Sequence, residues 1–351
     1  MFDNPWTTGN PRERPGSSYL FTNDDRKPDA GRTAAMSLLG RLDRILGKTG
    51  VHLEGRRARQ LRQKAWEGVA ELVMHPPVTS GEGAEGIVFS RDRAMQLHAF
   101  LGSWFSCVLS PCPLHVLYTT SDPAHERSYE QLREIWSGRV EFVRESAFRD
   151  DLLALIRGIS APRVVFFTDD GMFLDPFDLD EALCWDPRRH VFSLTKGRGL
   201  RHCFVTDRPQ SLPAFHPGPP GSEELLCWTW RDGDDGDWRF PLSLDGHVLG
   251  RQEMSTLMGA IPFRSPNTLE GEMQVYLPLF LAREGLCFPR EKLVNVPANS
   301  VQRDWRNRHT GLHGADELLR LWQEGQRIEH EVFRGLSCRD AETSSYRFLP
   351  R

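Results

Sequence analysis

Between residues 87 and 168 the sequence alternates short apolar segments with longer amphipathic ones. Strands are predicted at 87–89, 114–119, 140–143 and 163–167, and helices at 94–108, 123–136 and 148–159. Parallel strands need a long crossover, usually a helix, so this order favours parallel pairing. We therefore expect an α/β fold, a Rossmann-like and mostly parallel sheet flanked by helices.

The fourth of these strands ends in two adjacent carboxylates. The segment Arg163–Phe167 is followed by Thr168, then by Asp169 and Asp170, and then by Gly171, which lets the backbone turn. Ligands of open α/β sheets collect at the carboxyl ends of strands. Two neighbouring carboxylates repel each other unless a cation lies between them, and oxygen-only ligands suit Mg²⁺ or Mn²⁺. The pattern therefore indicates a metal–diphosphate site, with a plain turn after a core strand as the competing interpretation.

Composition and charge narrow the classes of partner that the chain is expected to bind. The chain has 351 residues, enough for one large or two ordinary domains. Its formal net charge of -4 and its scattered Lys and Arg argue against nucleic acid as the main partner. No apolar run approaches the length of a membrane span, and no signal peptide is visible. The oligomeric state is not defined by the sequence.

Cysteine usage predicts a cytoplasmic protein. The seven cysteines show neither a CxxC pair nor a Cys/His zinc spacing, which favours reduced thiols. A peripheral contact with the inner membrane is compatible with the sequence but has no marker in it. The chain also lacks GxGxxG after the first strand and GxxxxGK[ST] anywhere, which disfavours dinucleotide-dependent dehydrogenases and P-loop NTPases.

Beyond residue 170 the pattern loosens. Long helices are expected at 268–283 and 315–333. Between them and the central strand, three tryptophans alternate with aspartates: Trp228, Trp230 and Trp238. Aromatic rings beside carboxylates suit carbohydrate binding, because sugar C–H faces pack on rings while hydroxyls need acceptors. Core-anchoring tryptophans under a surface loop are the equal alternative.

Several motifs resemble those of a known family. The run Ile87–Arg93, with Gln96 and Leu97, resembles the opening of bacterial glycosyltransferases of the GT-A type, within an uncharacterised branch similar to glycosyltransferase family 2. Thr168, Asp169 and Asp170 then take the place of the DxD-like motif. The segments 241–247 and 265–270, and Asn295 with residues 299, 301 and 302, resemble the acceptor-side and C-terminal motifs of that branch. The resemblance covers residues 86–310.

The resemblance implies a metal-dependent transfer of a sugar from a nucleotide-diphosphate sugar to an acceptor hydroxyl, a hexosyltransferase-like reaction of class EC 2.4. The cofactor would be Mn²⁺ or Mg²⁺, and the acceptor a glycan, a lipid-linked sugar or a small molecule. The expected parts are an irregular arm (1–32), a helical extension (33–80), a nucleotide-sugar half (86–205), an acceptor half (206–335) and a C-terminal tail (336–351).

For a transfer of this kind, residues after the predicted strands are candidates for donor binding. Ser90 ends the first strand, where the nucleotide is expected, and Asp122 could accept a hydrogen bond from the base or simply cap a helix. Asp169 would assist through the sugar or ribose. The candidate cations for the diphosphate are Arg91, Arg93, Lys196 and Arg198.

An inverting transfer also needs a general base near the acceptor hydroxyl. Asp245 and Glu270 are equal candidates, since one precedes a turn and the other starts a helix. Asp169 and Asp170 would hold the metal, and His247 would complete its ligands. His309 and His313 compete with His247 for that position.

Two other functions fit the same pattern. A sugar nucleotidyltransferase shares the α/β layer, but it would carry glycines directly after the first strand, where this chain has Ser90–Arg93 without any. A non-catalytic carbohydrate-binding or scaffold protein would keep the fold without the chemistry, and the retained acids argue against it.

Overall fold

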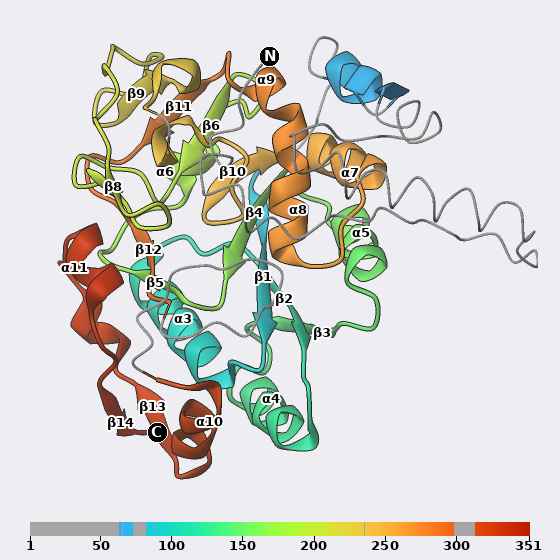
Figure 1. The fold of residues 1–351 in the computed structure, drawn as a ribbon, viewed down its shortest axis with the longest axis vertical. Helices are drawn as coiled ribbons and strands as arrows, with labels where there is room; N and C mark the ends of the chain where they lie inside the picture. Colours follow the sequence, from blue (N-terminus) through green and yellow to red (C-terminus); the bar gives the residue numbers. More distant parts are fainter. Residues whose placement is uncertain (1–62, 65, 73–81, 235, 298–312) are drawn as a thin grey trace, which may run out of the picture. The chain divides into compact units, whose positions relative to one another are not determined.

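A computed structural model describes residues 63–64, 66–72, 82–234, 236–297 and 313–351 of the chain. The predicted arm at 1–32, most of the helical extension at 33–80 and the candidate ligand His309 lie outside these residues. The chain divides into two compact units, Met1–Lys64 and Ala65–Arg351. The second unit carries every strand and helix that is labelled in Figure 1.

The elements of this unit follow the predicted alternation and then become shorter. The strands are β1 (Ala84–Arg91), β2 (Leu114–Thr119), β3 (Glu141–Arg144), β4 (Arg163–Thr168), β5 (Gly171–Phe173), β6 (His190–Ser193), β7 (His202–Cys203), β8 (Arg208–Pro209), β9 (Leu226–Thr229), β10 (His247–Gly250), β11 (Glu284–Cys287), β12 (Leu293–Asn295), β13 (Gln326–Ile328) and β14 (Phe348–Pro350). The helices are α3 (Ala94–Cys107), α4 (Pro123–Ile135), α5 (Phe148–Gly158), α6 (Asp180–Leu183), α7 (Arg251–Ala260), α8 (Pro266–Met273), α9 (Leu277–Phe280), α10 (Ala315–Gln323) and α11 (Cys338–Thr343). Short 3₁₀ segments are η3 (Trp230–Asp232), η4 (Asp237–Arg239), η5 (Gln274–Tyr276) and η6 (His330–Phe333).

The described part of the unit is built on a sheet of eight strands in the order β3-β2-β1-β4-β10-β6-β11-β9. Strands β3, β2, β1 and β4 are mutually parallel, and β6 and β11 form a further parallel pair. Strand β10 runs antiparallel to both of its neighbours, and β9 runs antiparallel to β11. The expected α/β fold, with a Rossmann-like and mostly parallel sheet, is confirmed.

Helices cover both faces because the chain reverses direction across the sheet. It moves outward from β1 through β2 to β3, and then returns to place β4 beside β1. Right-handed crossovers therefore put α3 and α4 on one face and α5 on the other. The contacts agree, since α3 packs on α4 and α5 packs on α7. The reversal leaves a switch point between β1 and β4, where ligands of such sheets bind.

Strand β4 is the centre of the core. Its middle four residues, Val164–Phe167, are completely buried, as expected of a strand that is covered on both faces. The ring of Phe167 packs against Phe100 and Trp104 of α3. Burial of several such aromatic side chains, each worth roughly 2–3 kcal/mol, fixes the position of β4 and of the polar residues after it.

The C-terminal half differs from the sequence prediction in two ways. The helix expected at 268–283 is broken into α8, η5 and α9, and the one expected at 315–333 ends at Gln323. Gly325, with φ of 79°, turns the chain there into β13. Such a left-handed residue stops a helix, and the periodicity beyond it comes from a strand and a 3₁₀ turn.

The tryptophans at 228, 230 and 238 are core residues. All three are fully buried, and Trp230 and Trp238 each pack edge to face on Trp228. The carbohydrate-platform interpretation is therefore wrong for these rings, because no face of them is open to a sugar. The described residues contain no helix that is both long and apolar enough to cross a bilayer.

Gly285 of β11 lies directly beside Trp228 of β9, and we predict that it tolerates no side chain. A Cβ at Gly285 would lie 2.3 Å from the Trp228 ring, so Gly285→Ala forces the packed tryptophans apart. The free energy of unfolding, measured by urea titration, should fall by about 1–3 kcal/mol. Gly259→Ala in α7 is the control, because a Cβ there meets no heavy atom within 4 Å. Equal stability of Gly285→Ala and wild type would contradict this packing.

Candidate active site

The switch point between β1 and β4 carries the polar residues predicted from the sequence. Ser90 lies near the end of β1, and Arg93 begins α3 three residues after it. Asp169 and Asp170 directly follow β4, which pairs with β1 in parallel. The two segments therefore meet at the same edge of the sheet, although 76 residues separate Arg93 from Asp169.

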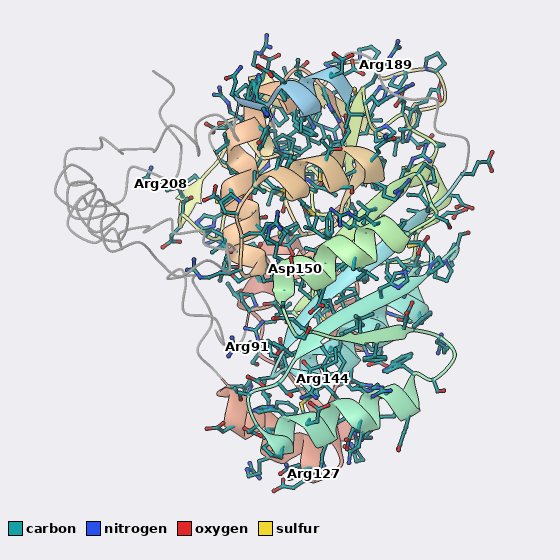
Figure 2. All side chains as sticks on the ribbon, turned by 90° about the vertical axis from the view of Figure 1, so that its right-hand side faces the viewer. Arg91, Arg127, Arg144, Asp150, Arg189 and Arg208 are labelled. Atoms are coloured by element: carbon teal, nitrogen blue, oxygen red, sulfur yellow. The ribbon has the colours of Figure 1, made fainter. Side chains whose placement is uncertain are left out.

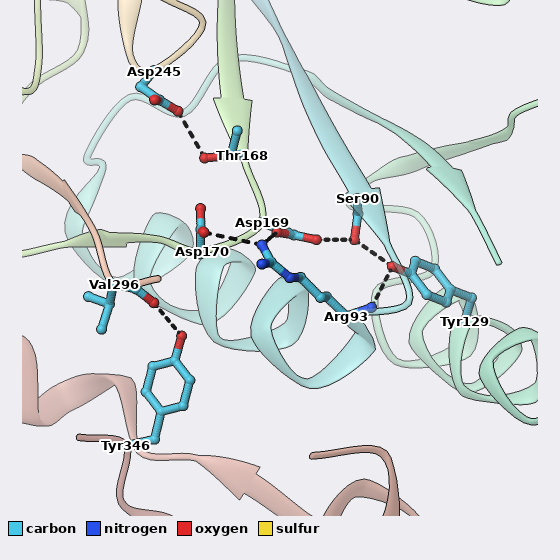
Figure 3. Close-up of polar contacts among 9 residues, drawn as sticks. All are labelled: Ser90, Arg93, Tyr129, Thr168, Asp169, Asp170, Asp245, Val296 and Tyr346. Atoms are coloured by element: carbon cyan, nitrogen blue, oxygen red, sulfur yellow. Dashed lines mark hydrogen bonds and ion pairs between the residues drawn. The ribbon is translucent and has the colours of Figure 1, made fainter. Parts of the chain in front are cut away.

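A single guanidinium forms ion pairs with both carboxylates. Nη1 of Arg93 lies 3.0 Å from Oδ1 of Asp169 and 3.1 Å from Oδ2 of Asp170 (Figure 3). The side chains are nearly inaccessible, with exposed fractions of 10% for Arg93, 5% for Asp169 and 12% for Asp170. Burial of a charge is costly unless it is paired, so this arrangement depends on Arg93.

Two further contacts hold Asp169 and Arg93 in place. The Ser90 hydroxyl donates to Oδ2 of Asp169 at 2.8 Å and is 2.5 Å from the hydroxyl of Tyr129. The Tyr129 hydroxyl also accepts the backbone N–H of Arg93 at 3.2 Å. Between Ser90 and Arg93, Asp92 has φ of 54°, and this left-handed residue turns the chain from β1 into α3. In this structure Ser90 therefore orients the carboxylate of Asp169.

Asp169 remains under electrostatic strain despite the arginine. Its pKa is raised to about 6, mainly by burial; Arg93 opposes the rise and the Asp170 carboxylate adds to it. A site that disfavours ionised carboxylates gains when a cation is added beside them.

Asp245 approaches the same edge from the turn before β10. The hydroxyl of Thr168 donates to Oδ1 of Asp245 at 2.8 Å (Figure 3), and the N–H of Gly246 donates to the carbonyl of Phe166 at 2.8 Å. Gly246 has φ of 67°, and a Cβ on it would lie 2.7 Å from Leu293. Glycine is required there, and the turn presents Asp245 beside Thr168.

Glu270, on α8, lies behind Asp245. Its Oε1 accepts the N–H of Leu244 at 3.0 Å and the hydroxyl of Ser243 at 3.1 Å. Burial raises the pKa of Asp245 to about 6 and that of Glu270 to about 7, with Asp170 adding to the first shift and Asp245 to the second. The structure therefore brings Asp170, Asp245 and Glu270 into one interacting group.

Lys196 provides the second cation of the group. It follows β6, is 5% exposed, and its ammonium donates to the Thr195 hydroxyl at 3.2 Å. Its charge lowers the pKa of both Asp245 and Glu270, against the effect of burial. A buried lysine among carboxylates is suited to bind a phosphate oxygen.

The donor set fits a hard divalent cation. Asp169, Asp170 and Asp245 offer carboxylate oxygens only, which is the ligand type that Mg²⁺ and Mn²⁺ prefer. His247 is fully buried, lies near the ring of Trp230, and its Nδ1 donates to the carbonyl of Pro241 at 2.9 Å. Burial lowers the pKa of His247 to about 3, so the ring is neutral, and its Nε2 has no hydrogen-bond partner among the described residues. A neutral ring with a free Nε2 is the form that binds a metal, so His247 stays a predicted ligand.

Three other predicted residues lie apart from this group. Arg91, labelled in Figure 2, has a side chain that is 56% exposed and lies 3.6 Å from Asp92. Arg198 is exposed and lies over the ring of Phe215. Asp122 caps α4 through the N–H groups of residues 124 and 125, and it lines a hollow of about 470 Å³ with Arg127 and Arg144. The helix-cap alternative for Asp122 is what the structure shows.

Sequence reasoning missed Tyr346, which it left in a C-terminal tail. The Tyr346 hydroxyl donates to the carbonyl of Val296 at 2.7 Å (Figure 3), and the N–H of Val296 donates to the carbonyl of Asp170 at 2.8 Å. Asp170 raises the pKa of this buried phenol, after burial itself. His313, a competing metal candidate, stacks on the Tyr346 ring. No local pattern around residue 346 marks it, since only the chain's return brings it to β4.

Comparison with known proteins adds one relative by sequence. The bifunctional glycosyltransferase pgtA of Dictyostelium discoideum is 24% identical over 195 residues, which cover 51% of this chain and 25% of that protein. The match thus spans about a quarter of the relative's length. It confirms the resemblance to glycosyltransferases, while the bacterial branch stays an expectation. No family model matches the chain.

Solved structures show only a distant likeness. The mannosyltransferase PcManGT of Pyrobaculum calidifontis, solved with GDP-Man and Mn²⁺, is 13% identical and covers 69% of each chain with a TM-score of 0.41. TarS of S. aureus (residues 1–349) is 11% identical, with 60% of this chain and 59% of that chain covered and a TM-score of 0.38. A nucleotidyl transferase of Methanothermobacter, Mth528, is 12% identical, with 60% and 89% covered and a TM-score of 0.35. Likenesses at this level carry no information about activity.

We predict that Arg93→Met destabilises the chain strongly in the absence of divalent metal. The change leaves Asp169 and Asp170 buried without their guanidinium. The free energy of unfolding in EDTA should fall by about 3–5 kcal/mol, and Mn²⁺ should restore part of it. Arg91→Met is the matched control and should change stability by less than about 0.5 kcal/mol, since Arg91 is exposed. Equal losses for the two variants would contradict the assignment.

The raised pKa of Glu270 predicts a pH dependence of stability. Between the ordinary value of 4.5 and about 7, the unfolded chain loses this proton before the folded chain does. Stability should therefore fall as the pH rises through this window, by on the order of 2 kcal/mol from this group. Glu270→Gln keeps an acceptor for Leu244 but cannot ionise. Urea unfolding in EDTA from pH 4.5 to 8 should show a slope in wild type that is smaller in the variant; parallel curves would contradict it.

Proposed function

We propose that this chain is a glycosyltransferase that moves a sugar from a nucleotide-diphosphate sugar to a hydroxyl of a carbohydrate-type acceptor, as a hexosyltransferase-like enzyme. The observation that carries the proposal is the convergence of Asp170, Asp245 and Glu270 with Arg93 and Lys196 at the carboxyl end of β4. The sequence similarity to a glycosyltransferase supports the same class.

The residues at this edge match what a diphosphate leaving group requires. Asp170, assisted by Asp169, would hold Mn²⁺ or Mg²⁺, and such an ion supplies Lewis-acid stabilisation of the leaving diphosphate when bound. Arg93 and Lys196 are the buried cations placed to donate to phosphate oxygens. Preorganised cations in a site that excludes water stabilise developing charge more strongly than solvated ones. Arg91 and Arg198, both exposed, are weaker candidates for this role.

The general base must have a pKa near the working pH. Glu270, with a pKa of about 7, meets this criterion better than Asp245, whose pKa is about 6. Asp245 lies closer than Glu270 to the proposed metal ligands, because its carboxylate accepts a hydrogen bond from Thr168, the residue before Asp169. We assign Glu270 as the preferred base and Asp245 as the residue that positions the acceptor or the metal. His247, whose Nε2 has no hydrogen-bond partner among the described residues, stays the proposed additional metal ligand.

The first test is a thermal-shift panel with UDP, GDP, CDP and dTDP, each with and without Mn²⁺. A nucleotide that binds the folded chain raises its melting temperature by mass action, and a ligand at 100 times its Kd adds about 2.7 kcal/mol. We expect a metal-dependent shift of several degrees for one nucleotide, lost in Asp170→Asn. The responding nucleotide names the donor class.

Asp150→Asn provides the matched control, because Asp150 lies on α5 with 78% of its side chain exposed. It should keep the full shift. The panel is repeated with the four corresponding nucleoside triphosphates, and a shift with one of these but with none of the diphosphates would instead favour a nucleotidyltransferase. Absence of any shift in wild type would overturn the metal–diphosphate site and leave a carbohydrate-binding or scaffold role on the same fold.

A further inference from the structure

A second group of metal-ligating side chains lies at the other end of the central sheet. Cys227 of β9, Glu284 of β11 and His216 of the preceding loop place a sulfur, a carboxylate oxygen and a ring nitrogen within 4.8 Å of one another. Strands β6, β11 and β9 lie together at one end of the sheet, with β10 between them and β4 (Figure 1). The group takes no part in the site at Asp170.

Strand register explains why these side chains meet. His216 and Cys227 form an antiparallel bridge, so their side chains project from the same face. Cys227 pairs with Leu286, and Glu284 lies two residues before Leu286, again on that face. Glu284 in turn pairs with His190 of β6. The four potential ligands His216, Cys227, Glu284 and His190 therefore form a row across neighbouring strands.

The hydrogen bonds orient the row for metal binding. Nδ1 of His216 contacts the carbonyl of Pro217 at 3.0 Å, and a carbonyl only accepts. In the neutral ring the proton is thus on Nδ1, and Nε2 keeps its lone pair. On the other side, Nε2 of His190 lies 3.1 Å from Oε2 of Glu284, and its Nδ1 lies 3.3 Å from the carbonyl of Asp186. These two contacts hold the ring of His190 beside the carboxylate as an outer partner.

Cys227 is closed off from solvent, with 1% of its surface exposed. A metal is bound by the thiolate and not by the thiol, so binding at Cys227 would release the thiol proton and depend on pH.

We propose that His216, Cys227 and Glu284 form a binding site for a zinc-class transition metal, with His190 holding the glutamate. Tetrahedral zinc places such ligand atoms about 3.3–3.6 Å apart, so the row closes by roughly 1 Å on binding. A thiolate and an imidazole select zinc or cobalt over Mg²⁺ and Mn²⁺, whereas the carboxylate-rich site at Asp170 does the opposite. The metal site is independent of the proposed glycosyl transfer.

The site would fasten a loop to the terminal strand of the sheet. Strand β9 is the last strand of the sheet, and in the described structure His216 meets it through a single bridge, with the N–H of His216 donating to the carbonyl of Cys227 at 3.0 Å. A metal joining His216 to Cys227 and Glu284 would cover this edge and limit pairing with other chains. The sequence shows no zinc spacing because the ligands come from three separate segments.

Cobalt is the most direct probe, because only a cysteine-containing site gives a thiolate-to-cobalt charge-transfer band. The full-length protein, stripped with chelator, is titrated with Co²⁺ and then with Zn²⁺ as competitor. We expect one equivalent of Co²⁺ to develop the band, and Zn²⁺ to displace it and raise the melting temperature. His216→Ala, at an exposed position, should abolish the band, and His190→Ala should weaken binding about 10–100-fold.

Cys184→Ser is the matched control, since Cys184 is exposed and lies outside the row. It should leave the band unchanged, while Cys227→Ala removes it. A band that survives Cys227→Ala and His216→Ala, or that disappears with Cys184→Ser, would overturn the proposal, as would no band at all in wild type. Nucleotide-induced shifts should be the same in all four variants, which separates this result from the test of Asp170.

Discussion

The pairing of Asp169 and Asp170 with a single buried guanidinium is the constraint on which this edge of the molecule depends. Two buried carboxylates at the end of a core strand cannot remain ionised without a counter-charge, and Arg93 supplies it from the start of α3. The position of α3 is in turn set by aromatic packing of Phe100 and Trp104 on Phe167. The packing of the core and the charge balance of the site are therefore coupled, because α3 provides the aromatic contacts and also positions Arg93.

The reversal of strand direction after β4 shapes the rest of the site. Because β10 runs antiparallel to β4, the turn that precedes β10 lies at the carboxyl end of β4. This turn places Asp245 where it accepts a hydrogen bond from Thr168, and Glu270 accepts the N–H of Leu244 in the same turn. The outcome is a graded set of acids, with pKa values of about 6 to 7, beside a lysine that remains buried. Such a gradient suits a site that must both hold a cation and accept a proton.

Much of the first half could be predicted locally. Strand β2 has the predicted bounds, and α3, α4 and α5 differ from theirs by one residue at the C-terminal end, because apolar periodicity and the turn residues agree there. The second half was predicted less well. Its helices are short and interrupted, and the tryptophans at 228, 230 and 238 satisfied two interpretations equally until burial decided between them. Aromatic residues beside acids carry no local signal of which side faces water.

The sequence by itself determined the α/β class, the central strand and the acids that follow it, since these depend on residue type and short-range period. Tertiary structure decided which charges meet. Arg91 and Arg93 are indistinguishable in sequence, yet a left-handed residue at Asp92 leaves the first exposed and turns the second onto Asp169. Tyr346 and the row at Cys227 likewise arise only when distant segments are brought together. Charge pairing and ligand geometry act over a few ångströms in space, whereas the sequence records only separation along the chain.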